Sequence, residues 1–178
     1  RSPLKKLVEG GEHLSPQFSL EEDFGQGLVP RFNELGEIAP PHVPLITQGK
    51  LASTLVTHRT AQEYALTSNA ANEGETLRSP RLHPGTLKES MVLSRLGTGL
   101  YISNLHYLNW SDLQQGRITG MTRYGCFWVE NGEIISPIMD MRFDETFYNF
   151  FGKNVEEVGD VAHLIPQNST YWERSLGG

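Results

Sequence analysis

Short apolar runs separated by turn residues are densest between residues 99 and 143, and they predict about four β-strands. The first strand covers residues 100–108 and follows Gly97-Thr98-Gly99. Residues 109–112 (Asn-Trp-Ser-Asp) read as a turn, because three of these side chains readily bond their own backbone. Residues 116–124 then lead into a hairpin. We therefore expect a four-stranded meander over residues 99–143.

The clearest local signal is Asn131-Gly132, which stands between two apolar, β-favouring runs within residues 124–138. This dipeptide suits a type I′ turn, whose two central residues need positive φ angles. The turn predicts a register in which Glu130 faces Glu133, Val129 faces Ile134, Trp128 faces Ile135 and Phe127 faces Ser136.

Both faces of this predicted hairpin are apolar, so we expect a central hairpin that is covered on both sides within a layered β structure. Cys126 shares the Trp128 face and is expected to be a small buried hydrophobe without reactivity. Glu130 and Glu133 are interpreted as a solvated tip; the alternative is a carboxylate pair that meets an arginine of a partner.

Three short helices have recognisable start signals. Thr86-Leu-Lys-Glu89 resembles a capping box and predicts a helix over residues 87–96 that ends at Gly97. Thr60-Ala-Gln-Glu63 repeats that pattern before a second short helix. Asp144 is expected to cap a third helix over residues 145–151, closed by Gly152.

Prolines and glycines divide the chain into short segments, which favours strands and loops over long helices. The predicted fold class is mainly β (α+β): a layered or barrel-like β-rich domain with a few short helices. We expect one domain over residues 1–178, with an irregular strand-loop region at 1–79, a β core at 80–152 and a tail at 153–178. Within the irregular region, residues 43–47 and 51–56 are candidate strands. The opening Arg1-Ser2-Pro3 suggests a piece of a longer protein.

Composition limits the function classes without choosing one. The 178 residues are 38% hydrophobic and 20% charged, which argues against a fully disordered chain. No apolar run is long enough for a membrane span, and a single cysteine excludes a disulfide framework. We expect a cytoplasmic protein without a membrane partner.

Charge is unevenly distributed along the chain. The net charge is −6, but residues 78–123 hold 6 basic and 2 acidic side chains and form a basic band between acidic flanks. The overall charge argues against direct nucleic-acid binding. The band is interpreted either as ordinary solvated faces or as a contact surface for an anionic ligand or an acidic partner.

No motif for metalloprotease, serine hydrolase or phosphate-loop chemistry occurs in the chain, and no catalytic residue is assigned. The six histidines are far apart and none has helical metal-ligand spacing with another, so no metal ligand and no cofactor are expected in this piece. A metal site assembled from distant loops stays the lesser alternative.

The densest polar cluster is interleaved with Tyr107 and Trp110. Asp112 could pair with Arg117 or Arg123 and hold the loop in place. Alternatively, the cluster lines a groove for an extended peptide backbone or an anionic group. The candidate binding residues are His106, Asn109, Asp112, Arg117, Thr119 and Arg123, with Thr122 beside them.

Several ordered motifs over residues 80–140 resemble the C-terminal half of TldD/PmbA proteins. They are a Pro84-Gly85 pair before a helix, Gly99-Leu-Tyr-Ile, Gly116-Arg-Ile-Thr-Gly120 and, above all, the hairpin at 127–138. The resemblance is weak over residues 1–79. The sequence Phe-Trp-Val-Glu-Asn-Gly-Glu resembles the PmbA (TldE) branch of the family more than the TldD branch.

The resemblance implies a β-rich C-terminal domain that abuts an N-terminal domain of the same protein. Family members are known as peptide-maturation and protein-degradation factors and as modulators of DNA gyrase. TldD-like members are zinc metallopeptidases that pair with a metal-free PmbA (TldE) subunit.

The chain also departs from the family's metallopeptidase pattern. The family's His-Glu-x-x-x-His helix has no counterpart here, and Cys126 does not match the third zinc ligand, so zinc is implied only for a full-length protein.

We therefore expect a structural, substrate-cleft and subunit-contact domain of a peptidase-family protein, with a TldD/PmbA-like homo- or heterodimer partner and a peptide substrate. Whether the full protein is catalytic stays open. The alternative is a stand-alone β module that binds an anionic ligand through residues 78–123. A weaker third possibility is an independent hydrolase.

Overall fold

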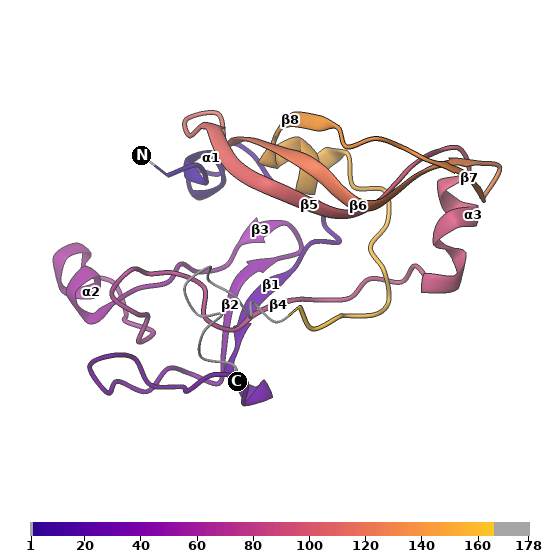
Figure 1. Ribbon diagram of the computed structural model, residues 1–178. Helices are drawn as coiled ribbons and strands as arrows, with labels where there is room; N and C mark the ends of the chain where they lie inside the picture. Colours follow the sequence, from indigo (N-terminus) through magenta and orange to yellow (C-terminus); the bar gives the residue numbers. More distant parts are fainter. Residues whose placement is uncertain (1, 166–178) are drawn as a thin grey trace, which may run out of the picture.

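The computed structural model describes residues 2–165 and shows two antiparallel sheets joined by loops and short helices. Figure 1 shows the long ribbons of the larger sheet running crosswise above the smaller sheet. This arrangement confirms the predicted mainly β (α+β) class. The strands of the larger sheet are β5 (Gly99–Asp112), β6 (Arg117–Glu130), β7 (Glu133–Pro137) and β8 (Arg142–Thr146).

The smaller sheet has the strand order β3-β2-β1-β4 and draws its strands from the stretch predicted to be irregular. Its central strands bury Glu22, Asp23, Val43 and Ile46. The candidate strand at 43–47 is confirmed, whereas the one at 51–56 is wrong beyond its first residue. The strands are β1 (Leu20–Asp23), β2 (His42–Thr47), β3 (Lys50–Leu51) and β4 (Pro80–Leu82).

The larger sheet has four strands, but they are not the four predicted ones and the sheet is not a meander. The strand predicted at 116–124 and the first hairpin strand form one continuous strand, β6, and β8 was not predicted. β6 is 14 residues long, so β7 pairs with its C-terminal half and β8 returns to its N-terminal half, along the same edge. The turn predicted at 109–112 is also displaced, because β5 continues to Asp112. The Asp112 carboxylate accepts hydrogen bonds from the backbone N–H groups of Gln114 (2.8 Å) and Gln115 (3.0 Å), and so forms the turn one step later.

The Asn131-Gly132 turn has the predicted geometry, with φ angles of 50° and 81°. The first two cross-strand pairs also match the prediction. Beyond them a β-bulge shifts the register, so that Trp128 faces Ser136 and Phe127 faces Pro137. The predicted partners of Trp128 and Phe127 are therefore wrong by one residue, because the prediction assumed an uninterrupted ladder.

In the part of the chain that the structure describes, the two strands of the hairpin are covered to different extents. Val129 and Cys126 are 0% and 1% exposed, which confirms that Cys126 is a buried small side chain. Ile134 and Ile135 are 49% and 55% exposed. The prediction of a hairpin covered on both sides is wrong for β7, because β7 is a five-residue edge strand.

All three predicted helices exist, but their N-termini differ from the prediction. The helix α2 (His58–Tyr64) is capped by Thr57, whose hydroxyl accepts from the backbone N–H of Thr60. The helix predicted at 87–96 begins as a 3₁₀ turn, η2 (Glu89–Met91), and continues as α3 (Val92–Leu96) up to Gly97, which has a φ of 64°.

The third helix is displaced because its expected cap lies in a strand. Asp144 belongs to β8, and the cap is Thr146, whose hydroxyl accepts from the Asn149 N–H at 3.1 Å. A π-helical segment, η3 (Asn149–Lys153), follows. The remaining helices are α1 (Lys5–Val8) and η1 (Phe24–Gln26).

The main hydrophobic core packs the smaller sheet against α1 and the segment that follows β8. It contains Leu7 of α1, Ile46 of β2 and Tyr148 near η3, with Leu14 and Phe18 between them. Among the residues described, no helix combines the length and the apolar character that crossing a bilayer requires.

Candidate functional site

The six sequence-predicted binding residues lie on one face of the larger sheet. Residues directly opposite one another in an antiparallel pair present their side chains on the same face. Asp112 faces Arg117, Asn109 faces Thr119, and His106 and Arg123 continue this row along β5 and β6. We call this surface the polar face; it consists of His106, Asn109, Asp112, Arg117, Thr119 and Arg123, together with Arg142 and Asp144 of β8.

Arg117 is held by Asp144 rather than by Asp112. The Arg117 guanidinium donates to the Asp144 carboxylate at 2.8 Å, and the two side chains are 43% and 39% exposed. This hydrogen bond raises the pKa of Arg117 and keeps the pKa of Asp144 below its ordinary value. The predicted pairing of Asp112 with Arg117 or Arg123 is wrong, because Asp112 closes the turn.

The neighbouring side chains are also fixed by contacts within the sheet. The Thr119 hydroxyl donates to the Phe143 carbonyl at 2.9 Å and accepts from Nε of Arg142 at 3.3 Å. Arg123 stacks over the ring of Tyr124, 5.1 Å from its centroid. These contacts hold two guanidinium groups in defined positions on the polar face.

The opposite side of β5 and β6 is an apolar groove of about 320 Å³. Trp110 and Ile118 contribute from the two strands, and Phe147, Phe150 and Phe151 close the groove from the η3 region. The rings of Trp110 and Phe147 lie 6.4 Å apart. Phe147 lies against Trp110 on this side, but Trp110 and Leu108 are still 40% and 58% exposed, so solvent reaches both sides of these strands.

The β5 strand leaves a long unpaired edge beside the polar face. In the described residues β5 pairs only with β6, so the N–H and C=O groups along its other edge have no strand partner. Tyr107 has a φ of 51° at a bulge that divides this 14-residue strand. Residues 99–106 precede this bulge, and their ladder with β6 shifts register once, between Ile102 and Asn104. Their other edge is open to an extended segment.

Most arginines of the basic band are occupied by partners within the fold. Arg81 pairs with Asp23, Arg95 with Glu157 and Arg117 with Asp144. Arg78 donates to the carbonyls of Pro30 and Phe32. The charges of Arg81, Arg95 and Arg117 are thus compensated by carboxylates, and this weakens the interpretation of residues 78–123 as an anion-binding surface.

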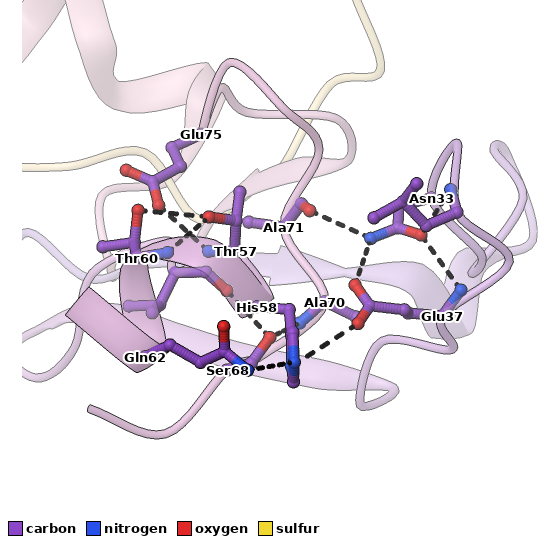
Figure 2. A network of polar contacts seen from close by, with 12 residues as sticks. Asn33, Glu37, Thr57, His58, Thr60, Gln62, Ser68, Ala70, Ala71 and Glu75 are labelled. Carbon is purple, nitrogen blue, oxygen red and sulfur yellow. Dashed lines mark hydrogen bonds and ion pairs between the residues drawn. The ribbon is translucent and has the colours of Figure 1, made fainter. Parts of the chain in front are cut away.

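A second polar cluster joins the loops around α2 (Figure 2). The Asn33 side chain donates to Glu37 at 2.7 Å and to the Ala71 carbonyl at 3.1 Å, and Glu37 lies 3.9 Å from His58. The Glu75 carboxylate accepts from the Thr57 N–H at 2.9 Å. This hydrogen bond lowers the pKa of Glu75. The cluster is a clamp between loops, since its carboxylates are engaged by neighbouring donors.

The sequence analysis did not place Arg142 and Asp144 among the residues of the polar face. Both belong to β8, which reaches the polar face only because the chain returns to β6 after the hairpin. Alternation along residues 142–146 (Arg-Phe-Asp-Glu-Thr) could have indicated a strand with Arg142 and Asp144 on one face. The helix-cap interpretation of Asp144 concealed this pattern.

A family model described as the PmbA/TldA metallopeptidase C-terminal domain matches residues 5–172. The chain belongs to this family. No curated protein matches it. The motifs around the Asn131-Gly132 hairpin thus lie inside a family match that also includes the smaller sheet.

Solved structures share this fold at low sequence identity. TldE from Thermococcus kodakarensis is 15% identical with a TM-score of 0.72, and the match covers 93% of this chain and 41% of TldE. A candidate modulator of a DNA gyrase from Thermotoga maritima is 20% identical with a TM-score of 0.69, over 90% and 40% of the two chains. A similar candidate from Bacteroides thetaiotaomicron is 11% identical with a TM-score of 0.61, over 85% and 35%. This chain spans about two fifths of the length of the first two.

The zinc implied by the metallopeptidase description does not fit the residues that the resemblance assigns to it. The sequence has no His-Glu-x-x-x-His segment. The longest α-helix in the described part, α2, has seven residues and carries one histidine, His58. Cys126 is buried, and its Sγ is 3.5 Å from the Arg123 carbonyl. We assign no residue of this chain to that zinc and no reaction step to it.

Proposed function

We propose that this chain is the C-terminal domain of a PmbA/TldD-family protein that acts in peptide processing or protein degradation, and that its polar face borders the substrate cleft. The observation that carries this proposal is the unpaired edge of β5 beside a row of fixed polar side chains. The fold match with TldE and the wording of the hairpin support the PmbA (TldE) branch.

An extended peptide would add to residues 99–106 as a further antiparallel or parallel strand. Backbone hydrogen bonds of this kind recognise the peptide main chain, and neighbouring side chains select among sequences. His106 and Arg123 stand nearest to this segment on the polar face, because they pair within two residues of each other across β5 and β6. Arg117 and Thr119 extend the surface toward the turn at 113–116.

The exposed apolar residues of β7 and the loop after it are proposed to contact other parts of the assembly. Ile134 and Ile135 are about half exposed, and Met139 is 87% exposed. Ile134 and Ile135 are consecutive in β7 and so place exposed apolar side chains on both sides of this edge strand. Exposed apolar surface is available for a protein contact. We assign the contact to the N-terminal domain of the same protein and to a TldD/PmbA-like partner subunit.

The test is to replace Arg117 and Arg123 together by alanine in the full-length protein with its partner subunit. If the polar face aligns substrate, hydrolysis of an unstructured peptide should fall at least tenfold while the assembly keeps its mass. Loss of both guanidinium groups should mainly raise KM, because in this proposal they bind the peptide substrate and take no part in the chemical step.

Arg59→Ala is the matched control, since Arg59 is an exposed arginine on α2, away from the larger sheet. The control should leave turnover unchanged. Unchanged turnover and assembly in the double variant would remove the polar face from the proposed cleft.

A further inference from the structure

Five ionisable side chains gather on one face of the smaller sheet, and none of them belongs to the polar face. Glu21 and Asp23 alternate along β1 and so point to the same side. Asp23 faces His42 on β2, and Glu21 faces Arg81 on β4. His83 lies two residues beyond Arg81. Three adjacent strands thus bring together residues separated by up to 62 positions.

The distances within this group are those of a ligand set. His42 Nδ1 is 3.3 Å from Asp23 Oδ1 and 3.6 Å from Glu21 Oε2, and the three ligand atoms all lie within 4.8 Å of one another. Ligand atoms about 2.1 Å from a tetrahedral zinc lie roughly 3.4 Å apart. The two distances from His42 are close to this spacing, and the carboxylate oxygens of Glu21 and Asp23 lie within 4.8 Å of each other.

We infer that Glu21, Asp23 and His42 form a binding site for a divalent metal ion of the zinc type, with His83 as a positioning residue. Two carboxylates and an imidazole match the nitrogen and oxygen ligands of zinc sites that keep one open position. His83 Nε2 is 3.0 Å from the other Glu21 oxygen, Oε1, which orients that carboxylate as outer partners of metal sites do.

The burial pattern suits a bound ion with access to solvent. The side chains of Asp23 and Glu21 are only 3% and 13% exposed, whereas His42 is 53% exposed. Arg81 Nη1 holds Asp23 Oδ2 at 2.9 Å and leaves Oδ1 turned toward His42. One arginine stands against two carboxylates here, and a bound cation would add positive charge beside them.

Gly25 borders the same space. Its N–H donates to Asp23 Oδ1 at 3.0 Å, and a Cβ at this position would stand 3.0 Å from that oxygen and 3.4 Å from the His42 ring. A side chain there would press on two of the three ligands. The absence of a Cβ keeps the ligand atoms accessible from the η1 side.

This site is independent of the proposed peptide-processing role. It also departs from the expectation of no metal ligand, which rested on histidine spacing along the sequence. The test is a titration of the tag-free 178-residue chain with zinc alone, in which calorimetry measures the binding. We expect one zinc per chain, and visible absorption from cobalt(II) in its place. His42→Ala should weaken zinc binding at least tenfold, and His83→Ala about tenfold.

His58→Ala is the matched control, because His58 is a half-exposed histidine that also lies beside a glutamate, Glu37. It should bind zinc as the unchanged chain does. If His42→Ala loses its thermal transition, His42→Asn replaces it. Nitrogen NMR of the unchanged chain gives a second readout, since only a ligating His42 Nδ1 shifts with zinc. No binding, equal binding by the His42 variants or an unshifted Nδ1 would overturn the inference.

Discussion

At the scale of single residues, Asp144 shows how a local signal can be overridden by a distant one. An aspartate before Glu145 and an aromatic run resembles a helix cap, but the Arg117 guanidinium 27 positions earlier takes the carboxylate instead. Thr146 performs the capping two residues later. A capping hydrogen bond and a charge-assisted pair are comparable in free energy, so the contacts of the strand decide between them.

The Arg117–Asp144 pair predicts a defined titration. Arg117→Gln should raise the pKa of Asp144 toward its ordinary value of about 3.8, because the hydrogen bond that lowers this pKa is lost. Since the folded pKa is depressed, the pair stabilises the fold above the unfolded-state pKa. That stabilisation disappears as pH falls through the lower folded value. Carboxyl-carbon NMR from pH 6 to pH 2 measures the shift; an unchanged Asp144 curve would contradict the assignment.

Two glycines with similar backbone angles should respond differently to alanine. Gly49 (φ 76°) lies against the carbonyls of Leu14 and Ser15, and a Cβ there would overlap with both. Gly27 (φ 68°) has open space around its Cβ position. Gly27→Ala should cost about 1 kcal/mol from the left-handed backbone alone. Gly49→Ala should cost at least about 2 kcal/mol more, as measured by urea unfolding; equal losses would contradict the predicted overlap.

At the scale of elements, the sequence predicts those features of helices and strands that depend on residues close together in the chain. The Asn131-Gly132 turn and the first two hairpin pairs depend on local backbone preferences, and they match the prediction. The bulge in β7 and the return of β8 to β6 depend on packing across the sheet. The binding residues were found together because β5 and β6 are adjacent hairpin strands, whereas Glu21, Asp23 and His42 meet only through three separate strands.

The π-helical segment after β8 should stabilise the fold mainly through one ring. Phe151 stacks within 5.3 Å of Phe18 and 4.9 Å of Phe147, next to the main core. Phe151→Ala should lower the free energy of unfolding by about 3 kcal/mol. Phe150 is 37% exposed, so Phe150→Ala should cost about half as much. Chemical denaturation of both variants tests the order; a larger loss for Phe150 would contradict it.

At the scale of the whole molecule, the core of the smaller sheet also packs against the segment that directly follows β8 of the larger sheet. Leu7, Ile46 and Tyr148 come from three distant parts of the chain and contact the same cluster. Breaking this cluster should therefore destabilise both sheets together.

We expect a single unfolding transition, with tryptophan fluorescence from Trp110 and Trp128 in the larger sheet and far-ultraviolet circular dichroism giving the same midpoint. Phe18→Ala should lower both midpoints equally, because Phe18 belongs to the main hydrophobic core. Separate midpoints would mean that the sheets unfold as independent units.

The ion pairs of residues 78–123 make a further prediction for the whole chain. Because Arg81, Arg95 and Arg117 already have carboxylate partners, binding of a polyanion such as heparin should be weak. A salt titration of heparin binding should show a shallow dependence on ionic strength. Tight binding with a steep slope would instead favour the anionic-ligand module.

The open side of β5 has a consequence for the molecule in solution. The open backbone edge of β5 from residue 99 to residue 106 is a template for an extended chain, including another copy of this one. At high concentration the isolated chain should self-associate through this open edge of β5, unless another peptide segment already pairs with it. A short synthetic peptide that suppresses such self-association would compete for the same row of amides that substrate is proposed to use.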